Sequence, residues 1–220
     1  MFRIRIQNKK KCIWYCSAVV SFLLFLLLLG WTNHLANTQD AQQMAGRWSE
    51  KKDVAQISCF FSSKAEVTED TIQSFEYSLK NVLQEASITE TSENPSARLW
   101  VDAYSADGKI TLVNGKNTLD ANAIGIGGDF FMFHPLKLIT GAYFSGNDLM
   151  QDYCIIDQDA AWQLFGSNDV VGMTVYIGNV PHIITGVVQR PDSRMDKAPA
   201  LNSTAVYVSY ETLSAYGTNN

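Results

Sequence analysis

One long stretch without charged side chains constrains this chain more than any other feature. Residues 12–39 contain no Asp, Glu, Lys or Arg, and residues 13–31 within them are almost entirely apolar. A helix needs about 20 apolar residues to cross a bilayer, which is close to the length of this run. Trp14, Tyr15 and Trp31 lie near its two ends, where aromatic rings favour the membrane interface. The stretch therefore predicts one transmembrane helix over residues 12–33.

The charges beside this helix predict its orientation. All basic residues near it precede it, and no acidic residue accompanies them: they are Arg3, Arg5, Lys9, Lys10 and Lys11. Positive charge collects on the cytoplasmic side of a membrane segment, so residues 1–11 are predicted to be a cytoplasmic basic segment. A cleaved secretory signal is the alternative. Such signals have a shorter apolar core than this run, and Ala36 is only a weak match to the small residues of a cleavage site. A retained helix is favoured.

The rest of the chain has the length and charge of one acidic domain outside the cytoplasm. A length of 220 residues leaves room for one ordinary domain beside the membrane helix. Five of the 17 basic residues precede the helix, so 12 basic residues remain against 22 acidic ones. An acidic domain repels phosphate backbones and anionic headgroups. Nucleic acid is therefore not expected as a partner.

The segment after the helix begins with a polar stretch and continues into a predicted strand and helix. Residues 34–53 have the Ala and Gln content of a helical stalk, and the domain is expected to occupy residues 54–220. Residues 54–62 are apolar and rich in strand formers, which predicts a strand. Thr68, Glu69 and Asp70 then open a segment with apolar residues three and four apart, the spacing of an amphipathic helix. Those apolar residues are Ile72, Phe75, Leu79, Val82 and Leu83.

A tight hairpin is predicted in the middle of the chain. Residues 98–104 alternate as a strand does, and Asp107-Gly108 is a common turn signal, so residues 110–113 would be the partner strand. Phe130 to Phe133 resemble one helical turn over the core, ended by His134 before Pro135.

The last third of the chain predicts short strands around one capped helix. Residues 138–144 and 153–156 have the composition of strands, and Asp157 caps a helix that Gly166 ends. Further strands are expected over residues 174–177, 182–188 and 205–209, and residues 191–199 are expected to be a mobile loop. The pattern is typical of a mixed α+β domain.

Four cysteines are too few to form a disulfide framework in a chain of this size. Cys12 and Cys16 lie at the cytoplasmic edge of the predicted membrane helix, where they are interpreted as lipid-facing filler, with acylation as the alternative. Cys59 and Cys154 lie in apolar strand-like stretches, where a free cysteine behaves as a small hydrophobic residue. The sequence leaves open whether these two cysteines form a disulfide.

The sequence contains no motif for catalysis, cofactors or metal binding. It has no phosphate-binding G-x-x-x-x-G-K-[ST] loop and no G-x-S-x-G nucleophile motif, and His34, His134 and His182 are not at metal-ligand spacing. The densest acidic group has neither the spacing nor the bidentate Glu of a calcium loop, and capping and solvation explain it: Asp148, Asp152, Asp157 and Asp159. We expect no enzymatic activity, no cofactor, no metal and no catalytic residue, and the sequence identifies no substrate-binding residue.

Five short blocks in a fixed order carry a family resemblance. They are Gly125-Ile-Gly-Gly-Asp-Phe-Phe, Leu138-Ile-Thr-Gly-Ala-Tyr-Phe, Ala160-Ala-Trp-Gln-Leu-Phe-Gly, Val171-Gly and Ile183-Ile-Thr-Gly-Val-Val. Behind an N-terminal membrane helix, they resemble the MacB-like periplasmic core domain of FtsX-like ABC transporter permeases. The blocks are built from apolar and turn-forming residues, so the resemblance concerns the fold more than a binding surface.

The resemblance implies a function without catalysis in this chain. It implies a bacterial permease in the cytoplasmic membrane, which would couple the motion of a separate ABC ATPase to export or to force transmission outside the membrane. A permease dimer and membrane lipid would be the other partners. Such permeases contain three further membrane helices, so we expect this sequence to be a piece of a longer permease. A free-standing membrane-anchored binding or sensing module is the alternative.

Overall fold

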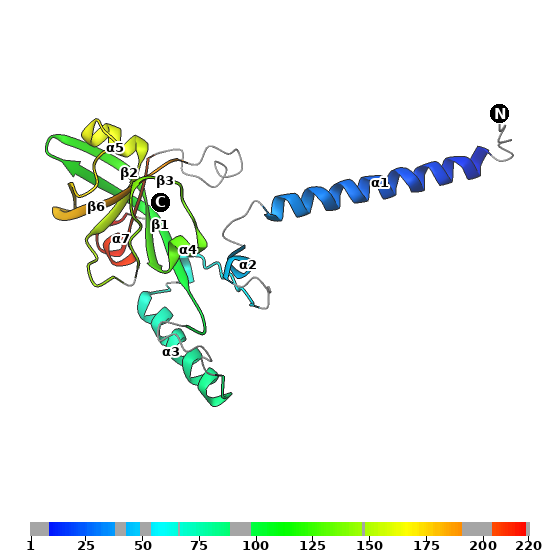
Figure 1. Ribbon diagram of the computed structural model, residues 1–220, viewed down its shortest axis with the longest axis horizontal. Helices are drawn as coiled ribbons and strands as arrows, with labels where there is room; N and C mark the ends of the chain where they lie inside the picture. The colour runs from blue at the N-terminus through cyan, green and yellow to red at the C-terminus, as the bar shows by residue number, and fades with distance from the viewer. Residues whose placement is uncertain are drawn as a thin grey trace. The chain divides into compact units, whose positions relative to one another are not determined.

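The computed structural model describes residues 9–37, 43–48, 54–65, 67–88, 98–146, 148–190 and 204–218. The chain divides into two compact units, Met1–Gln56 and Ile57–Asn220. Each unit is described by itself (Figure 1). The predicted loop over residues 191–199 lies outside the described residues.

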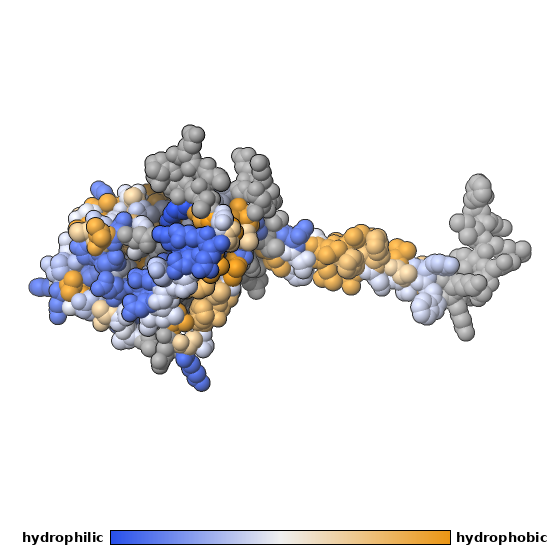
Figure 2. All heavy atoms as spheres, turned by 90° about the horizontal axis from the view of Figure 1, so that it is seen from below, coloured by the Kyte–Doolittle hydropathy of each residue, from blue (hydrophilic) through white to orange (hydrophobic). Residues whose placement is uncertain are grey.

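The first unit consists of a long apolar helix and a short second one. Helix α1 (Lys9–Asn37) contains the segment Ile13–Leu35, which among the described residues is the one stretch long and apolar enough to cross a membrane. Figure 2 shows its hydrophobic side chains as a band around the middle of the helix. The prediction of an N-terminal apolar helix is therefore confirmed. Helix α2 (Met44–Trp48) follows within the predicted stalk, and the backbone N–H of Ala45 donates to Oε1 of Gln56.

The second unit is built on a seven-stranded mixed sheet. The strand order is β3-β6-β4-β7-β2-β1-β5, in which β2–β7 and β4–β6 are parallel and the other pairs are antiparallel. Strand β5 pairs with both β1 and β6, so six of the strands form a closed ring. The strands are β1 (Ala103–Asn114), β2 (Asn117–Gly128), β3 (Leu138–Gly141), β4 (Tyr153–Asp157), β5 (Thr174–Ile177), β6 (Val180–Val188) and β7 (Ala205–Ser209).

Among the described residues, four α-helices and one 3-10 helix accompany the sheet. Helix α3 follows its predicted cap, because the Thr68 hydroxyl accepts the backbone N–H of Thr71 at 3.4 Å. Helix α5 is capped by Asp157 at its start, as predicted, and by Gly166 at its end, where φ is a left-handed 71°. The elements are η2 (Ser63–Ala65), α3 (Glu69–Glu85), α4 (Phe130–Phe133), α5 (Gln158–Phe165) and α7 (Tyr210–Tyr216).

The two faces of the central strands belong to two different apolar clusters. Cys154 and Ile156 of β4 lie in the larger cluster with Leu164 of α5, whereas Ile155 between them lies in the smaller cluster with α4. Strand β7 alternates in the same way. Because successive side chains of a strand point to opposite faces, β4 is buried on both sides. The α+β fold class predicted from the sequence is confirmed.

The predicted hairpin at Asp107-Gly108 is wrong. Both residues lie inside β1, where Asp107 pairs with Ile124 and Gly108 with Ala123 of β2, and the chain turns instead at Gly115, which has a φ of 60°. Gly108 serves a different purpose, because a Cβ there would lie 3.1 Å from a methyl carbon of Leu213 in α7. The glycine therefore allows a helix to approach the sheet.

Two further strand predictions fail near the start of the domain, and one helix was not predicted. Residues 54–62 form no described strand, and Phe60 is 89% exposed. Strand β1 begins at Ala103, so residues 98–102 are not part of it. Helix α7 was missed, although Ser209 provides the signal by accepting the backbone N–H of Thr212 at 3.1 Å.

Candidate functional site

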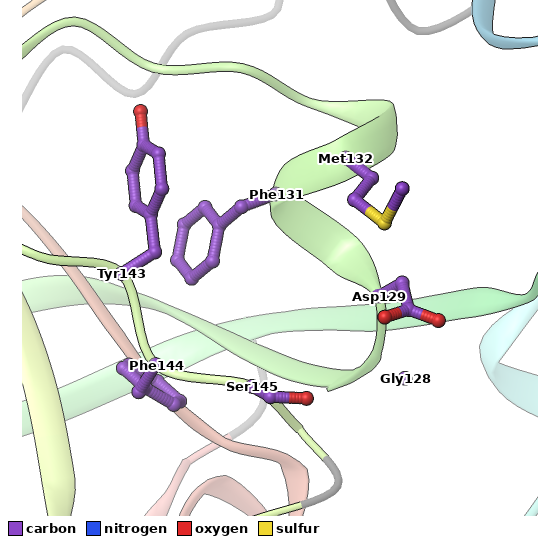
Figure 3. A pocket seen from close by; sticks show the side chains of 7 residues that line it. All are labelled: Gly128, Asp129, Phe131, Met132, Tyr143, Phe144 and Ser145. Atoms are coloured by element: carbon purple, nitrogen blue, oxygen red, sulfur yellow. The ribbon is translucent and has the colours of Figure 1, made fainter. Parts of the chain in front are cut away.

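An apolar hollow lies where β2 ends and α4 begins. It has a volume of about 270 Å3, slightly below the roughly 300–1,000 Å3 of typical small-molecule sites. In Figure 3 the rings of Phe131 and Tyr143 face each other on one side, and Met132 and Asp129 lie on the other. The lining residues are Gly128, Asp129, Phe131, Met132, Tyr143, Phe144 and Ser145.

The aromatic wall of the hollow is tightly packed. The rings of Phe131 and Tyr143 stack with their centroids 4.5 Å apart, and Phe144 meets Phe131 edge to face at 5.8 Å. The Tyr143 hydroxyl donates to the carbonyl oxygen of Leu136. Burial raises the pKa of Tyr143, although the bond to Leu136 opposes part of that rise. This wall is an apolar surface whose one hydroxyl group is already hydrogen-bonded.

Close backbone packing fixes the floor of the hollow. Gly128 has a φ of 61°, and a Cβ there would lie 2.6 Å from the carbonyl oxygen of Asp102. Gly146 lies against the same strand, and its N–H donates to the Gly128 carbonyl at 3.1 Å. Only glycine allows these approaches. The sequence block beginning at Gly125 therefore builds a close backbone crossing.

The polar side of the hollow is held by one ion pair. The Arg98 guanidinium lies 2.6 Å from Oδ2 of Asp129, whose side chain is only 15% exposed. The hydrogen bond to Asp129 is the main reason that the pKa of Arg98 is raised. This pair places Oδ2 of Asp129 against a positive charge on the polar side of the hollow.

Acidic side chains gather between α3 and the start of β1. The Tyr104 hydroxyl donates to Oε1 of Glu69 at 2.6 Å, and burial together with this bond raises the pKa of Tyr104. The pKa of Glu76 is also raised. Burial is the largest cause, followed by the charge of Asp102, a side-chain hydrogen bond with Asp102 and the charge of Glu69. We call Glu69, Glu76 and Asp102 the acidic cluster. Sequence reasoning missed it because Asp102, which lies just before β1, joins two glutamates of α3 only in the folded domain.

The acidic residues singled out from the sequence have separate structural roles. Asp157 caps α5, Asp148 accepts the backbone N–H of Ser145 at 2.9 Å, and Asp159 lies 3.1 Å from Arg190. Oδ1 of Asp152 is buried without a hydrogen-bond partner. Within the described residues, no group of three or more His, Cys, Asp or Glu side chains could hold a metal ion.

The histidines are as dispersed as the sequence predicted. His182 is buried, with Nδ1 at 3.0 Å from the Val180 carbonyl and Nε2 at 3.2 Å from the Thr212 hydroxyl. The ring of His134 stacks on Phe130 at 4.5 Å. His34 lies in α1. These placements are structural, and the expectation of no catalytic residue stays a prediction.

Cys59 and Cys154 do not form a disulfide. Cys154 is fully buried in β4, whereas Cys59 is exposed, and both thiols are free. Burial raises the pKa of Cys154, so its reactive thiolate form is disfavoured. Cys16 is exposed on α1 and is also free.

The fold and the site together define an α+β domain that follows a helix able to span a membrane, with an apolar hollow and an acidic cluster on its surface. Residues 20–219 match the family described as the MacB-like periplasmic core domain. The chain belongs to this family, and the resemblance seen in the sequence is confirmed.

The relatives carry the family's name and are much longer. The macrolide export ATP-binding/permease protein MacB of Pasteurella multocida (strain Pm70) is 30% identical over 98 residues, which is 44% of this chain and 14% of that protein. The protein of the same name from Shewanella sp. (strain W3-18-1) is 32% identical over 120 residues, or 52% of this chain and 18% of that protein. The chain thus spans less than a fifth of the length of either relative.

Two solved structures are similar to part of the chain. The extracellular domain of the noncanonic ABC-type transporter YknZ from Gram-positive bacteria has a TM-score of 0.42 at 24% identity, over 56% of this chain and 62% of that one. The periplasmic region of MacB from Actinobacillus actinomycetemcomitans has a TM-score of 0.41 at 24% identity, over 54% of this chain and 52% of that one.

Proposed function

We propose that this chain is the first transmembrane helix and extracytoplasmic domain of an ABC transporter permease. The observation that carries the proposal is the family match, which spans residues 20–219 and so includes most of α1 as well as the domain. Relatives named as macrolide export ATP-binding/permease proteins support the same class. We do not assign the substrate of these relatives to this chain.

The energy source in this proposal is a separate ABC ATPase. The relatives named as ATP-binding/permease proteins support a transport cycle driven by ATP. ATP binding by the partner would move α1, and the segment after it would pass that motion to the domain. A second copy of the permease would complete the transporter. The chain would act as a mechanical coupler and not as an enzyme.

The proposed location is the cytoplasmic membrane, with the N-terminus in the cytoplasm and the domain outside. The basic residues before the apolar segment Ile13–Leu35 and the acidic composition after it support this orientation. Lipid would cover the apolar side chains of Ile13–Leu35, which are exposed in the isolated chain.

Co-purification from native membranes tests the proposal. The full natural gene product, carrying an affinity tag, would be purified from membranes in a mild detergent, and its partners would be identified by mass spectrometry. An unrelated single-span protein with the same tag is the control for nonspecific recovery. Specific recovery of an ABC ATPase supports the permease. A stable preparation without an ATPase would favour the alternative, a free-standing membrane-anchored binding or sensing module.

A further inference from the structure

Helix α3 is amphipathic, yet none of its 17 residues is buried. Its apolar side chains Ile72, Phe75, Leu79 and Val82 form what we call the α3 stripe. Phe75 is 66% exposed and Val82 is 59% exposed. A stripe of this kind normally faces a core, but in Figure 1 α3 extends outward, with its first turn nearest the strands. Ile72 and Leu79 are half-buried, whereas Phe75 and Val82 have the pattern of a packing surface without a packing partner among the residues that the structure describes.

Polar contacts hold the start of α3 and leave Phe75 and Val82 of the stripe exposed. The Tyr104 hydroxyl binds Glu69 in the first turn, and the Tyr210 hydroxyl donates to the carbonyl oxygen of Val67 at 3.2 Å, just before the helix. The two tyrosine rings meet edge to face at 5.5 Å. These contacts fix the start of the helix against the domain, so the exposed stripe is presented on an anchored element.

The charge around the stripe restricts what can cover it. Helix α3 contains four acidic residues and one lysine, and Asp102 adds a further carboxyl beside Glu76. A second copy of α3 would bring the same excess of negative charge, and anionic lipid headgroups would also be repelled. A partner with positive charge would relieve the repulsion within the acidic cluster.

We propose that the α3 stripe is a docking surface for a basic amphipathic helix of a partner protein. Apolar side chains of the partner would cover Phe75 and Val82, and its Lys or Arg residues would lie over Glu76 and Asp102. Recognition of an amphipathic helix through its apolar face is a common binding mode. The inference goes beyond the proposed transport role and does not depend on it.

The size of α3 sets the expected affinity. A helix of 17 residues is about 25 Å long, and one of its faces offers less than the roughly 800 Å2 per partner of a standard interface. We therefore expect binding with a Kd on the order of micromolar, weakened by salt because charge contributes to it.

A pair of exposed aromatic residues on α3 provides the test. Phe75 lies in the stripe, and Tyr77, which is 69% exposed, points about 200° away around the helix. The full chain in phosphatidylcholine nanodiscs would be titrated against a fluorescent helical peptide with a leucine stripe flanked by lysines. A peptide with glutamate in place of each lysine and empty nanodiscs are the controls, and fluorescence polarisation reports binding.

The proposal predicts a specific pattern of binding. Phe75→Ala weakens the binding of the lysine peptide about tenfold, as loss of a central aromatic contact does, whereas Tyr77→Ala changes it less than about twofold. The glutamate peptide does not bind. Equal effects of the two substitutions, equal binding of the two peptides, or no binding at about 100 micromolar peptide would each overturn the proposal. A nanodisc dimer that Phe75→Ala dissociates would also overturn it, because a second copy would then cover the stripe.

Discussion

At the scale of single residues, Asp157 connects two parts of the domain through one buried carboxyl. Its Oδ1 accepts the N–H of Ala160 in α5 at 2.7 Å, and its Oδ2 accepts the N–H of Ala205 in β7 at 2.8 Å. Burial raises the pKa of Asp157, and these two hydrogen bonds oppose the rise. The carboxyl is kept in an unfavourable environment because it satisfies two backbone donors.

We predict that Asp157→Ala lowers the free energy of unfolding by about 1–3 kcal/mol, because it removes a helix cap and leaves a buried N–H without a partner. Asp157→Asn is the matched control, since it retains an oxygen for Ala160 but loses the acceptor for Ala205. Denaturant unfolding should order the stabilities as wild type, Asn, then Ala. Equal stability of the Ala variant and wild type would contradict the role of the carboxyl.

Glu76 leads to a prediction about pH. Because the pKa of Glu76 is raised above its ordinary value of 4.5, the folded domain favours the protonated form. This contribution to stability is complete below the unfolded-state pKa and is lost as the pH rises through the folded-state value. Glu76→Gln should therefore be more stable than wild type at pH 7, by less than about 1 kcal/mol because solvent screens the site.

Thermal unfolding at several pH values measures this effect. The advantage of Glu76→Gln should shrink as the pH falls towards 4.5. Asp107→Asn, which alters an exposed acid on β1, serves as the control and should change little. A constant difference between Glu76→Gln and wild type across this range would mean that protonation of Glu76 is not its cause.

At the scale of elements, α7 rests on two glycines in neighbouring strands. A Cβ added to Gly125 of β2 would lie 2.7 Å from the Leu213 side chain, and one added to Gly108 of β1 would lie 3.1 Å from it. Leu213 is 8% exposed and belongs to the larger apolar cluster. The glycines therefore create the space that this leucine occupies.

A double-mutant cycle tests this packing. Gly108→Ala should lower the free energy of unfolding by about 1 kcal/mol through overpacking against the methyl carbon of Leu213, and Leu213→Ala should lower it by about 2–5 kcal/mol through a cavity. The double variant should lose less than the sum of the two, because truncated Leu213 leaves room for the new methyl group. Additive losses measured by denaturant unfolding would show that the two sites do not share the space.

The same contacts explain which elements could be predicted from the sequence. Helix α3 and helix α5 were predicted because their caps and apolar spacing are local signals. The turn is predicted at Gly108 but lies at Gly115. Gly108 is needed for the close approach of Leu213, more than 100 residues later in the chain, and a local pattern cannot show this. The hollow and the acidic cluster likewise join residues from separate elements, so no local pattern indicated them.

At the scale of the whole molecule, the proposed orientation makes different cysteines accessible from different sides of the membrane. Cys59 is exposed in the second unit, Cys154 is fully buried, and Cys16 lies in the apolar part of α1. If the domain lies outside the cytoplasm, a membrane-impermeant maleimide added to intact spheroplasts has one accessible target, because lipid covers Cys16 and Cys12 is at the predicted cytoplasmic edge.

We therefore predict that intact spheroplasts label the chain at Cys59, as measured by the mass of the modified peptide. Cys59→Ala, the matched control, should abolish labelling, since the remaining thiols are buried in the domain or lie on the membrane side. Denaturation should then expose Cys154 to the reagent. Labelling of Cys59 only after permeabilisation would place the domain in the cytoplasm, and α1 could then not connect a cytoplasmic ATPase to a domain outside the membrane.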